Sequence, residues 1–139
     1  MAGYSKTSLA QKLGIKEAAL VLLLDAPEGL EATLGELPAD AVTADDITAA
    51  AAYDIILFFA KSQDDLRRQF PALKRRLKPA GGLWICWPKK ASGVETDLTE
   101  DIVREFALAG GLVDNKVCAV DNVWSGLRLV FRLRDRPNK

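Results

Sequence analysis

The chain has 139 residues, of which 49% are hydrophobic and 27% are charged, with equal numbers of basic and acidic side chains. These values predict a single domain over residues 1–139 and exclude a membrane helix, because no apolar run approaches the roughly 18 residues that a span requires. The chain has no histidine, which removes the most common metal ligand and general base, and no signal-like N-terminus, so we expect a cytoplasmic protein without a metal.

The N-terminal part of the chain predicts a helix, a strand and a second helix. Residues 7–13 have the polar cap and the following Gly14 that are typical of a short helix. The apolar run Ala19–Leu24 is short and flanked by polar residues, so it predicts a strand that is buried on both faces. A short helix is expected over residues 27–34, with Pro27 in its first turn.

The middle of the chain predicts two further strands and a longer helix. A short edge strand is expected around residues 41–43, and Asp54–Phe59 predicts a second buried strand. Ser62 is placed to cap a helix with one apolar stripe. The stripe consists of Leu66, Phe70, Leu73 and Leu77. Pro71 lies within this helix and lacks a backbone donor, so we expect a kink or a split there.

A turn, a third buried strand and a helix follow. The segment Pro79–Gly82 predicts the turn, and Leu83–Trp87 predicts the strand. The next helix is expected to begin at Thr96 or Asp97, with Glu100 in the position of a capping-box partner. Its predicted buried face consists of Leu98, Ile102 and Phe106.

The C-terminal part predicts two strands, over residues 112–120 and 123–133. In the second strand, apolar residues alternate with mostly basic ones from Leu127 to Arg134, which predicts a half-buried strand of an antiparallel pair. Strands and helices alternate before this hairpin. The chain therefore predicts a Rossmann-like three-layer α/β sandwich, with a mostly parallel sheet and an antiparallel C-terminal hairpin.

The charged side chains are unevenly distributed along the chain. Nine acidic residues and no Lys or Arg lie between Glu17 and Asp54, whereas basic residues exceed acidic ones from Lys61 onwards. One interpretation is two solvated faces of opposite sign. The other is electrostatic self-association into a homo-oligomer, or an anionic partner for the basic half.

Two segments of the second half resemble the class I S-adenosylmethionine-dependent methyltransferase fold. One is Tyr53–Phe59 with the helix that follows it and the sequence Leu77-Lys78-Pro79-Ala80-Gly81-Gly82-Leu83-Trp84-Ile85. It looks like the fourth strand, helix and fifth strand of that fold, and the final helix and hairpin look like its C-terminal ending. The resemblance implies S-adenosylmethionine as the cofactor.

The first half departs from that family. Asp25 stands where the family has an acidic residue, but Ala26 and Pro27 replace its glycine-rich loop. The chain from Asp25 to Tyr53 is also too short for two more strand–helix units, and Asp45 and Asp46 match the family's ribose-binding acid poorly. The residues themselves therefore predict no cofactor.

Seven short motifs occur along nearly the whole chain. They are Gly3-Tyr4-Ser5, Lys12-Leu13-Gly14-Ile15, Asp25-Ala26-Pro27-Glu28-Gly29, Trp87-Pro88-Lys89-Lys90-Ala91-Ser92-Gly93, Thr96-Asp97-Leu98-Thr99, Val117-Cys118-Ala119-Val120-Asp121 and Trp124-Ser125-Gly126-Leu127. On these motifs the chain is similar to a small bacterial family, a domain of unknown function. That family carries no assigned activity, so the resemblance implies none.

Candidate binding residues follow the ends of the predicted parallel strands, because ligands of such sheets bind beyond the carboxyl ends of the strands. The candidates are Asp25, Pro27, Glu28, Lys61, Trp87, Lys89, Lys90, Ser92 and Trp124. Trp87 could stack on a planar ring, and the two lysines could hold an anion. The alternative is that Trp87 packs on the core and the lysines are solvated.

Three functions are consistent with these patterns. The first is a non-catalytic module that binds a small molecule or a protein, since the chain has no recognisable catalytic constellation. The second is a methyltransferase-like transferase with a modified cofactor site. The third is DNA binding, because Ser8–Ile15 looks like the start of a helix-turn-helix, but Glu17–Leu24 has no polar face for a recognition helix.

Overall fold

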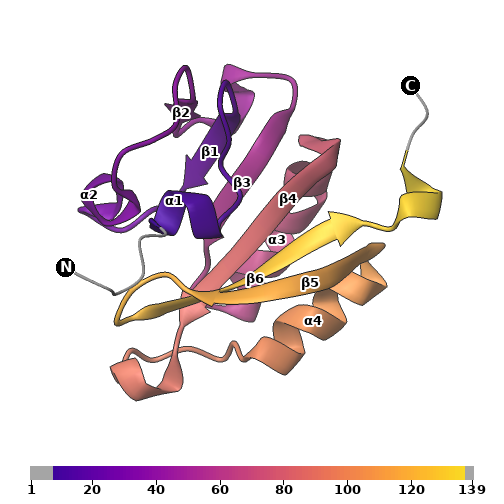
Figure 1. Ribbon diagram of the computed structural model, residues 1–139. Coiled ribbons are helices and arrows are strands. Elements are labelled where there is room, and N and C mark those ends of the chain that lie inside the picture. The colour runs from indigo at the N-terminus through magenta and orange to yellow at the C-terminus, as the bar shows by residue number, and fades with distance from the viewer. Residues whose placement is uncertain (1–7, 137–139) are drawn as a thin grey trace.

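A computed structural model describes residues 8–136 and shows a six-stranded mixed sheet with helices on both faces (Figure 1). The strands are β1 (Leu20–Leu24), β2 (Val42–Ala44), β3 (Tyr53–Phe59), β4 (Leu77–Pro88), β5 (Leu112–Ala119) and β6 (Trp124–Phe131). The α-helices are α1 (Leu9–Lys12), α2 (Leu30–Leu34), α3 (Gln63–Arg75) and α4 (Glu100–Ala109). Gly3–Ser5 and Thr7, which belong to the predicted N-terminal pattern, lie outside the described residues.

The strand order is β2-β1-β3-β4-β6-β5, and it confirms the predicted fold class. The first four strands in this order are parallel, whereas β6 is antiparallel to both β4 and β5. The carboxyl ends of the four parallel strands therefore lie at one rim of the sheet. Strand β6 begins at this same rim, because Trp124 pairs with Pro88 at the end of β4.

Each face of the sheet has its own hydrophobic core. On one face, β3 and β4 pack against α3 and α4 through Leu66, Phe70 and Val103. On the other face, the same strands pack against α1 and α2 through Leu13 and Leu34. Both faces of β3 and β4 are thus removed from water, which explains their nearly continuous apolar sequences.

Helices α2 and α3 differ from the prediction. Helix α2 begins at Leu30 rather than at Pro27, because residues 27–29 form a turn in which the Leu30 N–H donates to the Pro27 carbonyl. Helix α3 is one continuous helix across Pro71, so the predicted split does not occur. Its apolar stripe on the β-sheet holds the helix together although one backbone donor is missing.

Strand β4 is longer than predicted, because the segment Pro79–Gly82 is part of the strand and not a separate turn. Leu77 pairs with Tyr53, but Gly82 pairs with Ile55, so β4 accommodates extra residues at an irregularity in the ladder. Gly81 permits this close approach: a Cβ there would lie 2.6 Å from the backbone oxygen of Asp54.

The C-terminal half also differs in detail. Thr99 caps α4, so the helix begins later than predicted and Glu100 is its first residue; Val103 and Ala107 form its most buried positions. Strand β6 lies inside the sheet between β4 and β5, and it is buried on both faces rather than on one. Cys86 is buried, and burial raises the pKa of its thiol, whereas Cys118 is partly exposed.

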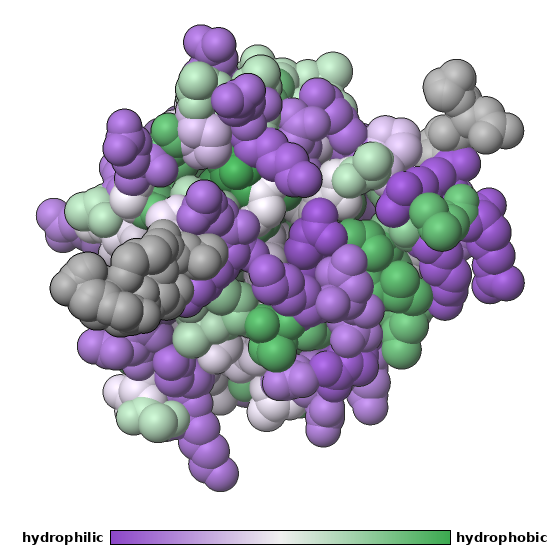
Figure 2. Space-filling view, in the orientation of Figure 1, coloured by the Kyte–Doolittle hydropathy of each residue, from purple (hydrophilic) through white to green (hydrophobic). Residues whose placement is uncertain are grey.

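The surface is mostly polar. In Figure 2, hydrophilic side chains cover most of the visible face, and apolar groups occur as small separate areas. The large hydrophobic residues that are exposed are Val42, Val94, Leu108, Val117 and Leu133. Within the described part of the chain, every helix is too short or too polar to cross a membrane.

Candidate functional site

The candidate site lies at the rim formed by the carboxyl ends of the parallel strands. Asp25 directly follows β1, Lys61 lies two residues after β3, and Trp87 is near the end of β4. Trp124 joins them because β6 starts beside the end of β4. The structure therefore places these four predicted residues at the same edge of the sheet, where α/β proteins bind their ligands.

The two tryptophans lie on opposite faces of the sheet. Trp87 is 5% exposed and belongs to the core beneath α3 and α4. Trp124 is 7% exposed and packs edge-on against Phe59 in the other core, with ring centroids 5.1 Å apart. Both indole rings therefore contribute mainly to packing, and neither stands free as a stacking platform.

A cleft of about 660 Å³ opens at this rim beyond β4. It is lined by residues 87–90, 93–96 and 98–100 and by Ser125, and we call it the rim cleft. Trp87 and Leu98 are its buried apolar components. Its volume lies within the range of roughly 300–1,000 Å³ that is usual for small-molecule sites.

Backbone and hydroxyl hydrogen bonds fix the loop that forms the cleft. The Lys89 N–H donates to the Val123 carbonyl at 2.7 Å, and the Ser92 hydroxyl donates to the Lys89 carbonyl at 2.7 Å. On the opposite wall, the Thr96 hydroxyl donates to the Lys61 carbonyl at 2.6 Å. The loop is thus tied to β6 and to the end of β3.

Positive charge in the cleft comes from Lys89 and Lys90. Within residues 8–136, neither ammonium group forms a hydrogen bond or an ion pair. Two acids line the cleft, Glu95 and Glu100, and the Glu100 carboxylate accepts from Arg104 at 2.5 Å. The hydrogen bonds that Arg104 donates to Glu100 and Asp114 raise the pKa of Arg104, so the Glu100 charge is already compensated.

The first turn of α4 forms the lower wall. Thr99 accepts the Ile102 N–H through its hydroxyl at 3.2 Å and lines the cleft together with Glu100. The amino end of a helix carries a partial positive charge, and α4 has ten residues. The first turn also contains Glu100 and Asp101, whose carboxylates offset this partial charge, so Lys89 and Lys90 remain the source of attraction for an anion.

Six of the nine predicted residues do not line this cleft. Trp87, Lys89 and Lys90 do, whereas the others are Asp25, Pro27, Glu28, Lys61, Ser92 and Trp124. The sequence prediction did not include Thr96, Leu98, Thr99 or Glu100 among the site residues. Their position could have been inferred from the sequence, because the segment between the end of β4 and the start of α4 is short. The start of α4 must therefore lie over the same rim of the sheet.

The loop after β1 does not fit the cofactor that the methyltransferase resemblance implies. Asp25 adopts a left-handed backbone with φ +57°, and Pro27 and Glu28 lead into Gly29, the single glycine of the loop. A glycine-rich loop would let the backbone approach a ligand, and this loop cannot do so along its length. Within residues 8–136, no cluster of three or more acidic or cysteine side chains is suited to a metal ion.

The structure gives one feature of this rim more weight than the sequence did. Because β2 pairs with β1 in parallel and Leu22 lies opposite Ala44, Asp45 follows β2 at the same rim as Asp25. The Asp46 carboxylate instead accepts a hydrogen bond from the Thr48 N–H at 2.9 Å, and this bond lowers the pKa of Asp46. An acid after the second strand is the type of residue that accepts ribose hydroxyls in Rossmann-like folds.

Solved structures with a similar fold are methyltransferases. A SAM-dependent methyltransferase from Aquifex aeolicus is 17% identical with a TM-score of 0.56, covering 86% of this chain and 85% of that one. The DhpI–SAH complex gives 12% identity, a TM-score of 0.62, and coverage of 92% and 84%. Aeropyrum pernix fibrillarin with bound S-adenosyl-L-methionine is 14% identical with a TM-score of 0.55, covering 85% of this chain and 69% of that one. At these identities the likeness shows the fold alone.

At the level of sequence, no curated protein matches the chain significantly. A family model does match, and it extends over residues 10–133, which is almost the entire chain. The chain therefore belongs to the DUF3052 family of proteins of unknown function.

Proposed function

We propose that this protein is a non-catalytic module that binds a small organic anion in the rim cleft. The observation that carries the proposal is the pairing of Lys89 and Lys90, which have no acidic partner in residues 8–136, with an apolar floor of Trp87 and Leu98. The apolar part of a ligand would lie on this floor. Its anionic group would meet the ammonium groups of Lys89 and Lys90.

The chemistry of the lining supports binding more than catalysis. The hydroxyls of Ser125 and Thr99 can donate hydrogen bonds to a ligand, whereas the Thr96 hydroxyl already donates to the Lys61 carbonyl. General acid–base catalysis needs a group whose pKa is placed near neutrality, and the chain has no histidine for that role. Lys89 and Lys90 would attract an anion by their charge.

The test is isothermal titration with carboxylates of graded apolar content, for example acetate, benzoate and naphthoate. We expect affinity to rise with the size of the apolar body, and we expect the double variant Lys89→Gln with Lys90→Gln to lower it at least tenfold. Lys61→Gln is the matched control, because Lys61 is an exposed lysine of the same rim that does not line the cleft. Equal losses in both variants, or no binding by the unaltered protein, would refute the proposal.

A transferase with a modified S-adenosylmethionine site is the second candidate. It is favoured by the position of Asp45 at the same rim as Asp25 and by the ligands bound in two similar structures, SAH and S-adenosyl-L-methionine. Thermal shift with S-adenosylmethionine and S-adenosylhomocysteine tests it, since a ligand that binds the folded state raises its stability. A shift that disappears in Asp45→Asn or Asp25→Ala would favour the transferase, whereas no shift would leave the binding module.

A further inference from the structure

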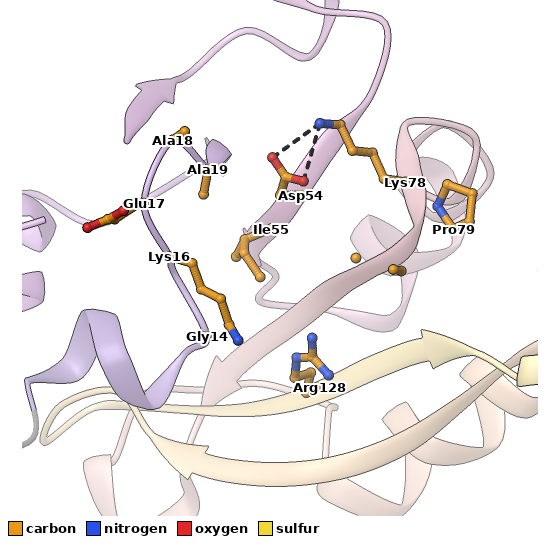
Figure 3. A pocket seen from close by; sticks show the side chains of 12 residues that line it. Gly14, Lys16, Glu17, Ala18, Ala19, Asp54, Ile55, Lys78, Pro79 and Arg128 are labelled. Atoms are coloured by element: carbon orange, nitrogen blue, oxygen red, sulfur yellow. Dashed lines mark hydrogen bonds and ion pairs between the residues drawn. The ribbon is translucent and has the colours of Figure 1, made fainter. Parts of the chain in front are cut away.

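A second cavity lies at the opposite end of the sheet, near the amino ends of the parallel strands. It has a volume of about 650 Å³, and we call it the amino-end cavity (Figure 3). Its walls come from Gly14 and residues 16–19, from Asp54 and Ile55 in β3, from residues 78–81 in β4 and from Arg128 in β6. It shares no residue with the rim cleft.

The wall that precedes β1 is held in place by a buried tryptophan. The Trp84 indole N–H donates to the Leu13 carbonyl at 2.9 Å, and Trp84 is fully buried. Gly14 then turns the chain with φ +87°, and the Ala18 N–H donates to the Ala39 carbonyl at 2.9 Å. Lys16 lies between these two fixed points, and its side chain extends into the cavity in Figure 3.

Arg128 enters the cavity from the centre of the sheet. It lies on β6 opposite Trp84 of β4, and its guanidinium covers Gly82, where a Cβ would overlap the Arg128 side chain. Across residues 8–136, Arg128 forms no ion pair or hydrogen bond with any side chain. Burial, and in second place the charge of Arg136, lower the pKa of Arg128, so this cation is poorly compensated in the protein alone.

The acids of the cavity do not compensate Arg128. Asp54 accepts hydrogen bonds from the Leu20 N–H at 2.8 Å and from the Lys78 ammonium at 3.2 Å. Its negative charge therefore compensates Lys78 and not Arg128. Glu17 lines the cavity, but Figure 3 shows its side chain directed away from Lys16 and Arg128. The arrangement leaves one ammonium and one guanidinium facing the same hollow.

We propose that the amino-end cavity binds the phosphate group of a small phosphorylated molecule, with Arg128 and Lys16 as the anion-binding residues. A guanidinium presents parallel N–H donors that match two phosphate oxygens, and an ammonium adds a point charge. The small residues Gly14, Ala18, Ala19 and Ala80 keep the hollow open beside these cations. The volume exceeds what a phosphate ion needs, so the remainder would hold the organic part of the ligand.

Isothermal titration with inorganic phosphate and with ribose 5-phosphate, at fixed ionic strength, tests this inference. We expect ribose 5-phosphate to bind more tightly than phosphate, and we expect Arg128→Gln and Lys16→Gln each to weaken binding at least tenfold. Arg128→Lys should recover only part of the affinity, because the charge remains but the paired donors are lost. Lys90→Gln is the control, since it alters the rim cleft alone.

Each outcome decides between this site and its alternatives. Melting temperatures without ligand separate lost binding from lost folding, and Lys16 is exposed on a loop, so its variant should fold normally. Equal affinity for phosphate and ribose 5-phosphate would refute a site for a phosphorylated molecule. Binding that persists in both Arg128→Gln and Lys16→Gln, or that Lys90→Gln abolishes, would refute the cavity as the site.

Discussion

Two glycines in neighbouring strands make room for two large side chains on the α1 face of the sheet. Gly82 of β4 lies beneath Arg128 of β6, and Gly126 of β6 lies beneath Trp84 of β4, where a Cβ would approach the indole to 3.0 Å. Each strand of this antiparallel pair thus contributes one glycine and one large side chain. The sequences around Gly82 and Gly126 therefore specify the position of both the buried indole and the cavity arginine.

Trp84→Phe should destabilise the protein more than its loss of volume requires. The variant leaves the Leu13 carbonyl without its buried donor, which costs about 1–3 kcal/mol in addition to the lost apolar contacts. Urea unfolding followed by circular dichroism measures this loss. Trp124→Phe is the control, because Trp124 is also buried but its indole N–H donates to no residue within 8–136. Equal losses in the two variants would contradict the role of the hydrogen bond.

At the scale of elements, helix α3 depends on packing rather than on its own backbone bonds. Its cap is complete, since Ser62 accepts the Asp65 N–H at 3.0 Å, and acidic residues at its start and basic residues at its end suit the helix dipole. Pro71 nevertheless interrupts the ladder within the helix. The buried residues Leu66, Phe70 and Leu73 compensate for this cost.

Pro71→Ala should therefore stabilise the protein by about 1–2 kcal/mol. The change restores a backbone donor inside α3, and part of the gain is offset because the unfolded chain becomes more flexible. Pro71 is exposed, so its removal leaves no cavity. The midpoint of urea unfolding measures the effect, and Pro79→Ala is the control outside any helix. A lower midpoint for Pro71→Ala would show that the ring contributes contacts that the helix needs.

The elements show how far the sequence predicts this fold. The apolar runs of β1 and β3 predict strands, because burial on both faces leaves a continuous apolar sequence. The alternation from Leu127 to Arg134 predicts the final hairpin, although β6 is buried on both faces and not on one. The extent of β4 was not, because Pro79–Gly82 has the composition of a turn and pairs with β3 only through the close approach at Gly81. Local composition does not reveal a backbone contact between distant segments.

The sequence predicts the rim at which the candidate site lies, but not which residues line the rim cleft. The rule for parallel strands located the rim, but whether a residue faces the cleft depends on the pairing of β4 with β6, which puts Trp87 and Trp124 on opposite faces. The amino-end cavity was not predicted, because Lys16, Lys78 and Arg128 are far apart in sequence and lie away from that rim. Only the folded sheet brings these three cations together.

At the scale of the whole molecule, the two charged parts of the sequence become different regions of the fold. The segment 17–54, which has acids and no Lys or Arg, contains β1, α2 and β2 at one end of the sheet. Basic residues line a groove of about 750 Å³ on the α3 side, where Lys74, Arg75 and Lys78 surround Phe70 and Phe131. The net charge of zero leaves no overall repulsion between copies.

We predict weak self-association that depends on salt. At an ionic strength of about 0.01 M, where charges act over about 30 Å, acidic residues of one copy would attract the basic groove of another. This attraction would fall at about 0.15 M, where the screening length is about 8 Å. Sedimentation velocity at both salt concentrations measures it. Arg75→Glu should reduce the association, whereas Lys90→Glu, with the same change in charge but outside the groove, should change it less. A monomer at both salt concentrations would show that the two regions are only solvated surfaces.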